Sequence, residues 1–375
     1  MAHAYTPGLK VLHQSEVEKN RRLPIKGEVL KEQGDNVLPN DIVAKTDLPG
    51  NVQMVKVSNL LNIGPGDIHD AMIVKNGVAI SKGQIIAEMA GLFGFFKSDV
   101  KSPIDGTLES VSDVTGVAVL REAPIPVEVD AYMSGSVKEI IPEEGVVIGA
   151  KAAFIQGIFG IGGESRGEIV IVSSSRDDEI KPEMITTEHE GKIIVGGSFI
   201  SLEAYQKARA MKVAGVVVGG FNYFDLEALL GYTLGVAITG TESLGTSLVL
   251  TEGYGKIQMS DRTFSLLKEH ENHFASINGA TQIRAGVIRP EIVIPLDENQ
   301  ISDDIQFESQ EIGIDAGSLV RIIRAPYFGK IGKVTRLPSD LEKMESETMV
   351  RVAEIEVDGE ILKVPRSNLE MLETN

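Results

Sequence analysis

The stretch Gly317-Ser-Leu-Val-Arg-Ile-Ile-Arg-Ala-Pro-Tyr-Phe-Gly-Lys-Ile-Gly-Lys-Val334 gives the clearest structural signal in the sequence. Apolar, β-branched residues flank a segment in which Gly329 and Gly332 allow a tight turn, a pattern typical of two strands joined as a hairpin. Tyr327 and Phe328 lie at this turn. The sequence therefore predicts a β-hairpin that exposes an aromatic pair.

The same region is locally basic. Five basic residues follow one another without an intervening acid: Arg321, Arg324, Lys330, Lys333 and Arg336. Basic and aromatic side chains on one loop are the chemistry that a phosphate or base-stacking contact requires. These cations could instead pair with the protein's own acids, and Glu342, Glu345 and Glu347 return the segment to near neutrality. We expect the five basic residues, with Tyr327 and Phe328, to contact a protein partner or a local piece of RNA.

Residues 314–375 closely resemble the KOW motif of NusG-type transcription factors and several ribosomal proteins. The matching residues are Gly317, Val320, Arg321, Pro326, Gly329, Gly332 and Val334, followed by closing strands at 350–357 and 363–372. The resemblance implies an SH3-like β-barrel. Barrels of this family bind ribosomal RNA, ribosomal proteins or RNA polymerase, so the resemblance implies a binding module and leaves its partner open.

A short theme recurs in the first 160 residues: a β-rich run, a turn at glycine and a second β-rich run. It is found at 26–44 and 73–87, and again at 101–111 and 134–147. Two short helices are expected near 57–71, as an insertion between copies. Residues 1–22 precede the first copy, and we expect them to form an N-terminal extension.

This theme resembles the biotinyl/lipoyl-like, barrel-sandwich hybrid motif, which implies a flattened β-barrel over residues 23–167. A carrier domain of this kind needs a lysine in an Asp-Lys-Ala or Met-Lys-Met context at a hairpin tip, and neither tripeptide occurs. We therefore expect the scaffold without a cofactor. Hybrid-motif folds also occur in carboxylases, carrier proteins and the RnfC subunit of electron-transport complexes, which implies an accessory subunit as an alternative function.

The stretch 154–167 is the most glycine-dense of the chain. Gly157, Gly160, Gly162 and Gly163 do not have the spacing of a dinucleotide fingerprint, and no amphipathic helix follows them. Glycine lets a backbone approach a ligand or another strand closely. Two interpretations stay open: a bend between domains, or a nest for an anion or cofactor.

Residues 168–295 have the pattern of an α/β domain. A buried strand at 192–195, an amphipathic helix at 202–211 and a buried strand at 214–220 form a unit that favours a parallel sheet. This unit resembles swivelling β/β/α or protease-associated-type domains. Residues 296–313 are expected to be a linker to the C-terminal barrel.

Two more helices are expected in this domain, one at 223–230 and one that Ser260 caps and that runs to His270. His270 and His273 flank Glu271 and could share one helical face as metal ligands. A polar run of this kind at the end of a helix is more often a solvated turn. We therefore predict a solvated helix end without metal.

Polar side chains interrupt an otherwise apolar run at 276–291. They are Asn278, Thr281, Gln282, Arg284 and Arg289. Amide, hydroxyl and guanidinium groups need hydrogen-bond partners when they are buried. We expect either a ligand or partner site here, or hydrogen bonds that lock one domain to the next.

The composition limits the function. The chain has 375 residues, no cysteine and a formal charge of −18, from 36 Lys and Arg against 54 Asp and Glu. No window approaches the length of a membrane span, and the N-terminus has no signal-peptide core, so we expect a cytoplasmic protein without membrane insertion. The leading hypothesis is a multidomain α+β, non-catalytic adaptor with a protein partner, and a homo-oligomer is compatible with the sequence.

Overall fold

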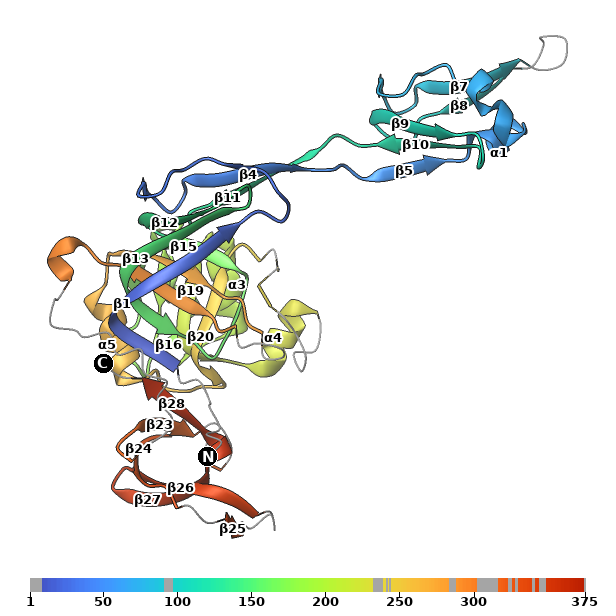
Figure 1. Cartoon of the computed structure of the whole chain (residues 1–375). Coiled ribbons are helices and arrows are strands. Elements are labelled where there is room, and N and C mark those ends of the chain that lie inside the picture. Colours follow the sequence, from blue (N-terminus) through green and yellow to red (C-terminus); the bar gives the residue numbers. More distant parts are fainter. Residues whose placement is uncertain are drawn as a thin grey trace.

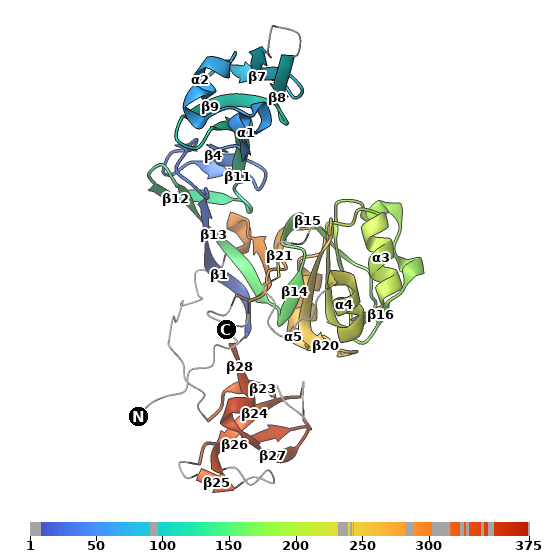
Figure 2. The ribbon, with the colours of Figure 1, turned by 90° about the vertical axis from the view of Figure 1, so that its right-hand side faces the viewer.

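The computed structural model shows a β-rich protein built from several sheets (Figures 1 and 2). The described residues are 9–90, 97–231, 239–240, 242, 244–282, 288–301, 316–322, 326–327, 330–338, 341–343 and 349–373. An arm projects from an N-terminal unit, which lies against a central unit, and a C-terminal unit lies at the opposite end of the molecule.

The N-terminal unit is built on one long strand, β1. Its strands are β1 (Leu9–Arg22), β2 (Glu28–Val29), β3 (Asn36–Val37), β4 (Ile42–Leu48), β11 (Ile125–Asp130), β12 (Gly135–Ile141) and β13 (Gly145–Gln156). β1 pairs antiparallel with β13 from Val11 opposite Ile155 to Arg22 opposite Gly145. The stretch expected to be an N-terminal extension is therefore mostly a strand, because β1 buries apolar side chains such as Val17 between its charged residues.

The arm, residues 52–121, is inserted between two paired strands. Its elements are β5 (Val52–Val55), α1 (Val57–Leu61), α2 (Ile68–Ala71), β6 (Ala79–Ile80), β7 (Ile85–Ala90), β8 (Lys97–Lys101), β9 (Gly106–Ser112) and β10 (Val117–Arg121). Leu48 of β4 is paired with Ile125 of β11, so the chain leaves and re-enters the N-terminal unit at neighbouring positions. The arm has a hydrophobic core of its own, formed by residues between Val55 and Leu120.

The repeated sequence theme forms nested pairs. The first copy contributes β3, which pairs with β12 from the fourth copy. The second copy contributes β6, which pairs with β9 from the third copy. The predicted helices near 57–71 are α1 and α2, and they pack within the arm.

The central unit contains a parallel sheet covered on both faces. Its elements are β14 (Phe159–Ile161), β15 (Glu164–Ile171), β16 (Glu179–Ile180), β17 (Ile193–Val195), β18 (Phe199–Ile200), α3 (Leu202–Ala210), β19 (Gly215–Phe221), α4 (Tyr223–Leu230), β20 (Ser247–Tyr254), α5 (Asp261–Glu269), β21 (Phe274–Asn278) and β22 (Glu291–Pro295). Strands β15, β17, β19 and β20 are parallel neighbours. The parallel pair predicted at 192–195 and 214–220 is β17 and β19. Helices α3 and α4 pack in one core and α5 packs in the other.

The predicted helices of this unit agree with the structure to within one residue at each end. The three helices are confirmed, and the Ser260 hydroxyl accepts a hydrogen bond from the Thr263 amide at the start of α5. The expected domain start at residue 168 falls inside β15. The reason is that the glycine-rich segment before it forms β14 and the first half of β15 instead of a bend.

The C-terminal unit is antiparallel and curves around its own core (Figure 1). Its strands are β23 (Leu319–Ile322), β24 (Ile331–Arg336), β25 (Leu341–Lys343), β26 (Met349–Val357), β27 (Glu360–Pro365) and β28 (Leu369–Glu373). β28 also pairs in parallel with the first residues of β1, Leu9 and Lys10. Of the expected linker, residues 296–301 are described. Within the described ranges, no helix has the length and apolar character that crossing a bilayer requires.

Because the arm has its own core, we expect it to fold independently. A fragment of residues 51–122 should show dispersed amide resonances, and a chain in which Asn-Gly replaces residues 49–124 should keep the rest of the structure. Leu48 and Ile125 are cross-strand partners, so a two-residue turn can join them. A disordered fragment together with an unfolded deletion variant, measured by NMR and circular dichroism, would contradict this independence.

Candidate functional site

Two of the segments singled out in the sequence meet in one junction. The Gly160 amide donates to Thr281 Oγ1 at 2.9 Å, and the Thr239 hydroxyl donates to the Gly160 carbonyl at 2.7 Å. The Thr281 amide donates to Thr239 Oγ1 at 2.9 Å. Thr239 and Thr281 are both buried. The glycine-rich segment and the 278–282 loop are therefore locked to each other.

The close approach that glycine permits here is to the chain itself. A Cβ atom on Gly160 would lie 2.6 Å from the Gly279 carbonyl oxygen, and one on Gly157 would lie 2.7 Å from the Leu250 carbonyl oxygen. A Cβ on Gly163 would lie 2.6 Å from the Gly240 carbonyl oxygen. Backbone from neighbouring segments of the same chain therefore occupies the space beside these glycines.

One carboxylate of the chain fills the position that an anion would take in this segment. Glu242 Oε2 accepts hydrogen bonds from the Gly162 amide at 3.1 Å and from the Gly240 amide at 2.7 Å. Backbone amides that converge in this way form a nest for an oxyanion. The nest is an internal contact, with Glu242 as its anion.

The remaining polar residues of the 276–291 run do not gather into one pocket. Asn278 Oδ1 accepts from the Ala280 amide at 2.9 Å, and Gln282 and Ile288 exchange two backbone hydrogen bonds. Arg289 lies half-buried just before β22. Arg284 lies outside the described residues. The part of this run that the structure describes supports the locking interpretation.

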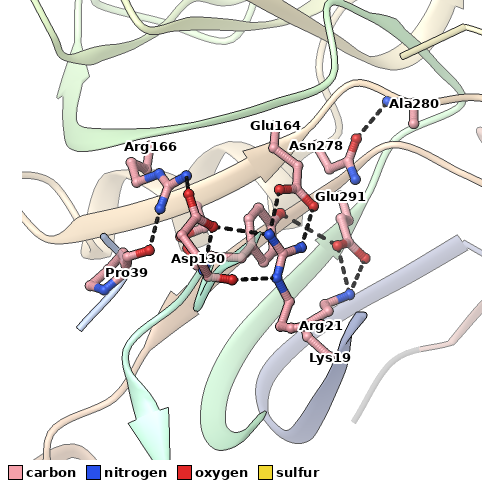
Figure 3. A network of polar contacts seen from close by, with 11 residues as sticks. Lys19, Arg21, Pro39, Asp130, Glu164, Arg166, Asn278, Ala280 and Glu291 are labelled. Atoms are coloured by element: carbon pink, nitrogen blue, oxygen red, sulfur yellow. Dashed lines mark hydrogen bonds and ion pairs between the residues drawn. The ribbon is translucent and has the colours of Figure 1, made fainter. Parts of the chain in front are cut away.

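A cluster of charged side chains lies where the N-terminal unit meets the central unit (Figure 3). Arg21 of β1 is its centre. The Arg21 guanidinium donates to both Glu164 carboxylate oxygens, at 2.6 and 3.0 Å, and to Asp130 Oδ1 at 2.9 Å. Arg21 Nε donates to the Asp130 carbonyl at 2.7 Å. One arginine therefore connects strands β1, β11 and β15.

A second arginine extends the cluster on the other side of Asp130. The Arg166 guanidinium of β15 donates to Asp130 Oδ2 and to the Pro39 carbonyl oxygen. Asp130 thus lies between the two guanidinium groups, as Figure 3 shows. The Pro39 contact joins the loop between β3 and β4 to the central unit.

Lys19 completes the cluster at its far end. Its ammonium contacts both carboxylate oxygens of Glu291 at 2.6 Å, and the Tyr132 hydroxyl lies 3.4 Å from Glu291 Oε1. Burial, and then the charge of Glu291, raise the pKa of Tyr132 well above its usual value, so its phenol stays protonated and donates. Burial alone would lower the pKa of Arg21, but Glu164 and Asp130 outweigh it and raise that pKa.

The cluster is electrically balanced. Three carboxylates face three cations: Asp130, Glu164 and Glu291 against Lys19, Arg21 and Arg166. Multiply hydrogen-bonded charged pairs are directional, so they add geometric specificity to the contact between the two units. None of these six residues was predicted from the sequence as part of a site. One signal was available in the sequence. Lys19 and Arg21 are charged residues at alternate positions of a run that otherwise has strand character.

Arg321, predicted to contact an external partner, is buried inside the molecule. Its Nη2 lies 2.8 Å from Glu252 Oε2, and both side chains are 3% exposed. Arg321 Nη1 also donates to the Thr251 carbonyl at 3.3 Å, and Glu252 Oε1 accepts from the Ser260 amide at 3.0 Å. The partner of Arg321 is therefore the central unit of the same chain. Glu252, a carboxylate at the end of a buried strand, was the signal in the sequence.

The other residues predicted to form the basic and aromatic face do not share the buried environment of Arg321. Arg336 pairs with Glu354 at 2.8 Å, and Lys330 lies 3.9 Å from Asp358. Tyr327 packs against the core of the C-terminal unit instead of standing exposed. Lys333 is exposed on β24. Arg324 and Phe328 lie outside the described residues.

His270 differs from the expected solvated helix end. It is buried, its ring lies 5.3 Å from that of His273, and its Nδ1 has no hydrogen-bond partner among the described residues. Burial, followed by the proximity of His273, lowers the pKa of His270 below its ordinary value of 6.5. Among the described residues, no group of three or more acidic or histidine side chains is arranged to hold a metal.

Comparison with known proteins gives no relative: no protein-family model matches the chain, and no curated protein is significantly similar to it.

Removing one partner of the buried Arg321–Glu252 pair should loosen the C-terminal unit. We expect Arg321→Met to cost about 3–5 kcal/mol, because Glu252 is left buried without its counter-ion, and the double change Arg321→Met/Glu252→Met to cost much less. Hydrogen exchange of the β20 and β23 amides measures the effect. Arg336→Met, which breaks an exposed pair, is the control and should change little. Equal losses in the single and double variants would refute the pairing.

The buried His270 should make the protein acid-sensitive. Its folded-state pKa is depressed, so the unfolded chain binds more protons as the pH falls below 6.5. The stability contributed by neutral His270 is therefore complete above that pH and is lost as the pH falls toward the folded-state pKa. Urea midpoints measured from about pH 7.5 to about 5.5 should fall more steeply for wild type than for His270→Leu. Parallel slopes would show that this group does not titrate differently on folding.

Proposed function

We propose that the chain is a non-catalytic adaptor whose arm binds a protein partner while its C-terminal unit is docked on its own central unit. In this proposal the N-terminal unit and arm are two nested barrel-sandwich hybrid units, the central unit is a swivelling-type α/β domain, and residues 314–375 are a KOW-like, SH3-like barrel. The observation that carries the proposal is the composition of the arm's surface.

The arm differs from the rest of the chain in charge. Residues 52–121 contain six Lys and Arg against seven Asp and Glu, whereas the remaining residues contain 30 against 47. Almost all the net negative charge therefore lies outside the arm. A nearly neutral element that projects from an acidic molecule can approach another protein without strong repulsion.

The arm also exposes apolar side chains. It holds six of the 16 large hydrophobic residues that are exposed in the described structure, although it has 64 of the 319 described residues. These six are Val52, Met54, Leu60, Ile73, Val78 and Val114. Exposed apolar side chains gathered on one element are typical of a surface that another protein covers.

The contacts of the C-terminal unit favour docking over RNA binding. Arg321 is buried against Glu252, and Arg336 and Lys330 face acids of their own unit. Cations that are already paired release fewer counter-ions on binding a phosphate backbone, so they contribute less to RNA affinity. The internal ion pairs support a docked module that holds its position relative to the central unit.

The accessory-subunit alternative rests on the same nested hybrid architecture and stays a prediction. The residues of the arm that pair as β6–β9 belong to the second and third repeat copies, which gave this resemblance. The two functions differ in the class of protein that should bind the arm. An adaptor of transcription or translation and an accessory subunit of a metabolic enzyme are therefore separable by identifying the partner.

Affinity purification from the native cells with mass spectrometry, with and without nuclease, tests the proposal. We compare wild type, the arm-deletion variant and the double variant Lys330→Glu/Lys333→Glu. The expected result is a protein partner that resists nuclease, is lost without the arm and is retained by the double variant. Nuclease-sensitive recovery that the double variant loses would replace the proposal with RNA binding. An arm-dependent metabolic enzyme would establish the accessory subunit instead.

A further inference from the structure

Two short chain segments join the arm to the N-terminal unit. They are residues 49–51, which lead from β4 into β5, and residues 122–124, which lead from β10 back into β11. We call these six residues the neck, and Figure 1 shows them as the narrow connection between the two pairs of strands. The arm's sheets, β5-β10-β9-β6 and β7-β8, include no strand of another unit among the described residues. Strand pairing therefore does not extend from the arm into the rest of the molecule.

The neck interrupts what would otherwise be one continuous antiparallel ladder. The β4–β11 ladder ends with Leu48 opposite Ile125. Extending it by one residue places Pro49 opposite Pro124. Extending the β5–β10 ladder in the other direction gives the same register. Two prolines therefore occupy facing positions in the middle of a two-stranded ribbon.

The facing prolines remove hydrogen bonds that would hold the neck rigid. The Glu122 amide donates to the Asn51 carbonyl oxygen at 2.9 Å, so this position is a hydrogen-bonded pair. Such pairs recur at every second residue of an antiparallel ladder, and the next one falls at Pro49 and Pro124. Neither can donate there, because proline has no N–H. The ladder is therefore broken where the arm leaves the N-terminal unit.

Apolar packing does not replace the missing hydrogen bonds. Neither of the two apolar clusters beside the neck, as far as the structure describes them, contains a neck residue. Both prolines, Asn51 and Ala123 are exposed. Gly50 is buried because the two segments touch there, and a Cβ atom on it would lie 2.2 Å from the Glu122 carbonyl oxygen. The neck thus has one tight contact point instead of a packed interface.

Polar side chains favour the orientation of the arm seen in Figures 1 and 2. Arg121, which Glu109 anchors within the arm at 2.6 Å, donates from Nη1 to the Gly50 carbonyl oxygen at 3.0 Å. The Asn51 amide nitrogen donates to Glu122 Oε2 at 2.7 Å. Water competes for hydrogen-bonding groups at a surface, so these two contacts favour one orientation without fixing it.

We propose that the neck is a hinge about which the arm moves as a rigid body relative to the N-terminal unit. Proline fixes its own φ, so the rotation takes place at the backbone torsions of Asn51 and Ala123, with Gly50 as the pivot. Units that share no large packed interface move relative to one another. The hinge goes beyond the proposed adaptor function and does not depend on the partner. It lets the arm meet a partner at a range of angles while β1 holds the other units together.

Double electron–electron resonance between nitroxide labels tests the hinge on the full chain, which has no cysteine of its own to label. Ser110→Cys on β9 and Glu18→Cys on β1 form the pair across the neck. Ser110→Cys with Ser98→Cys on β8 is the control pair within the arm, and all three positions are exposed. The distance distribution across the neck should be at least about twofold broader than the control, because hinge residues absorb large φ/ψ changes. Equal widths would overturn the hinge.

Restoring the ladder distinguishes motion at the neck from motion of the labels. Pro49→Val/Pro124→Val supplies the two missing N–H donors and should narrow the distribution across the neck toward the control width. Asn51→Ala removes a contact that favours one orientation and should broaden it. The control pair should keep its width in both variants, because neither change touches the arm's core. A width across the neck that the proline replacement leaves unchanged also overturns the hinge. A rigid arm could still bind its partner, so that result leaves the adaptor proposal standing.

Discussion

The arrangement of this protein depends on β1, a single strand that three units share. Its backbone pairs with β13 along most of its length and with β28 at Leu9 and Lys10. Its side chains Lys19 and Arg21 reach Glu291 and Glu164 of the central unit. Because the same strand holds the N-terminal, central and C-terminal units, the position of each unit is constrained by the others through β1.

Two sets of buried or half-buried ion pairs lie at boundaries between units. The N-terminal unit, the arm and the C-terminal unit each have an apolar cluster, whereas the Arg21 cluster and the Arg321–Glu252 pair join separate units. Apolar burial is non-directional, and charged hydrogen bonds are directional. At the boundary between the N-terminal and central units, strand β13 also pairs with β22, and Val11 and Ile155 pack in one apolar cluster with central residues. The charged pairs add directional contacts to this apolar boundary.

The sequence predicted the features that depend on neighbouring residues. Helices α3 to α5 and the parallel strands between them follow from apolar periodicity and from a cap such as Ser260, all within a few residues. The missed features depend on distant residues. Arg21 and Glu164 are 143 positions apart, and no local pattern matches one to the other. For the same reason the sequence did not show that Arg321 pairs with Glu252. The sequence showed the basic residues, but it could not show that Arg321 points toward the central unit.

The insertion of the arm also dictates an order of events during synthesis. The arm's core is complete once residue 120 has been made, whereas the N-terminal unit needs β12 and β13, which come later. Domains generally fold as units as the chain leaves the ribosome. The arm can therefore form while β1 and β3 still lack their partners β13 and β12. The pairing of β1 with β28 can form only once Leu372 has also emerged.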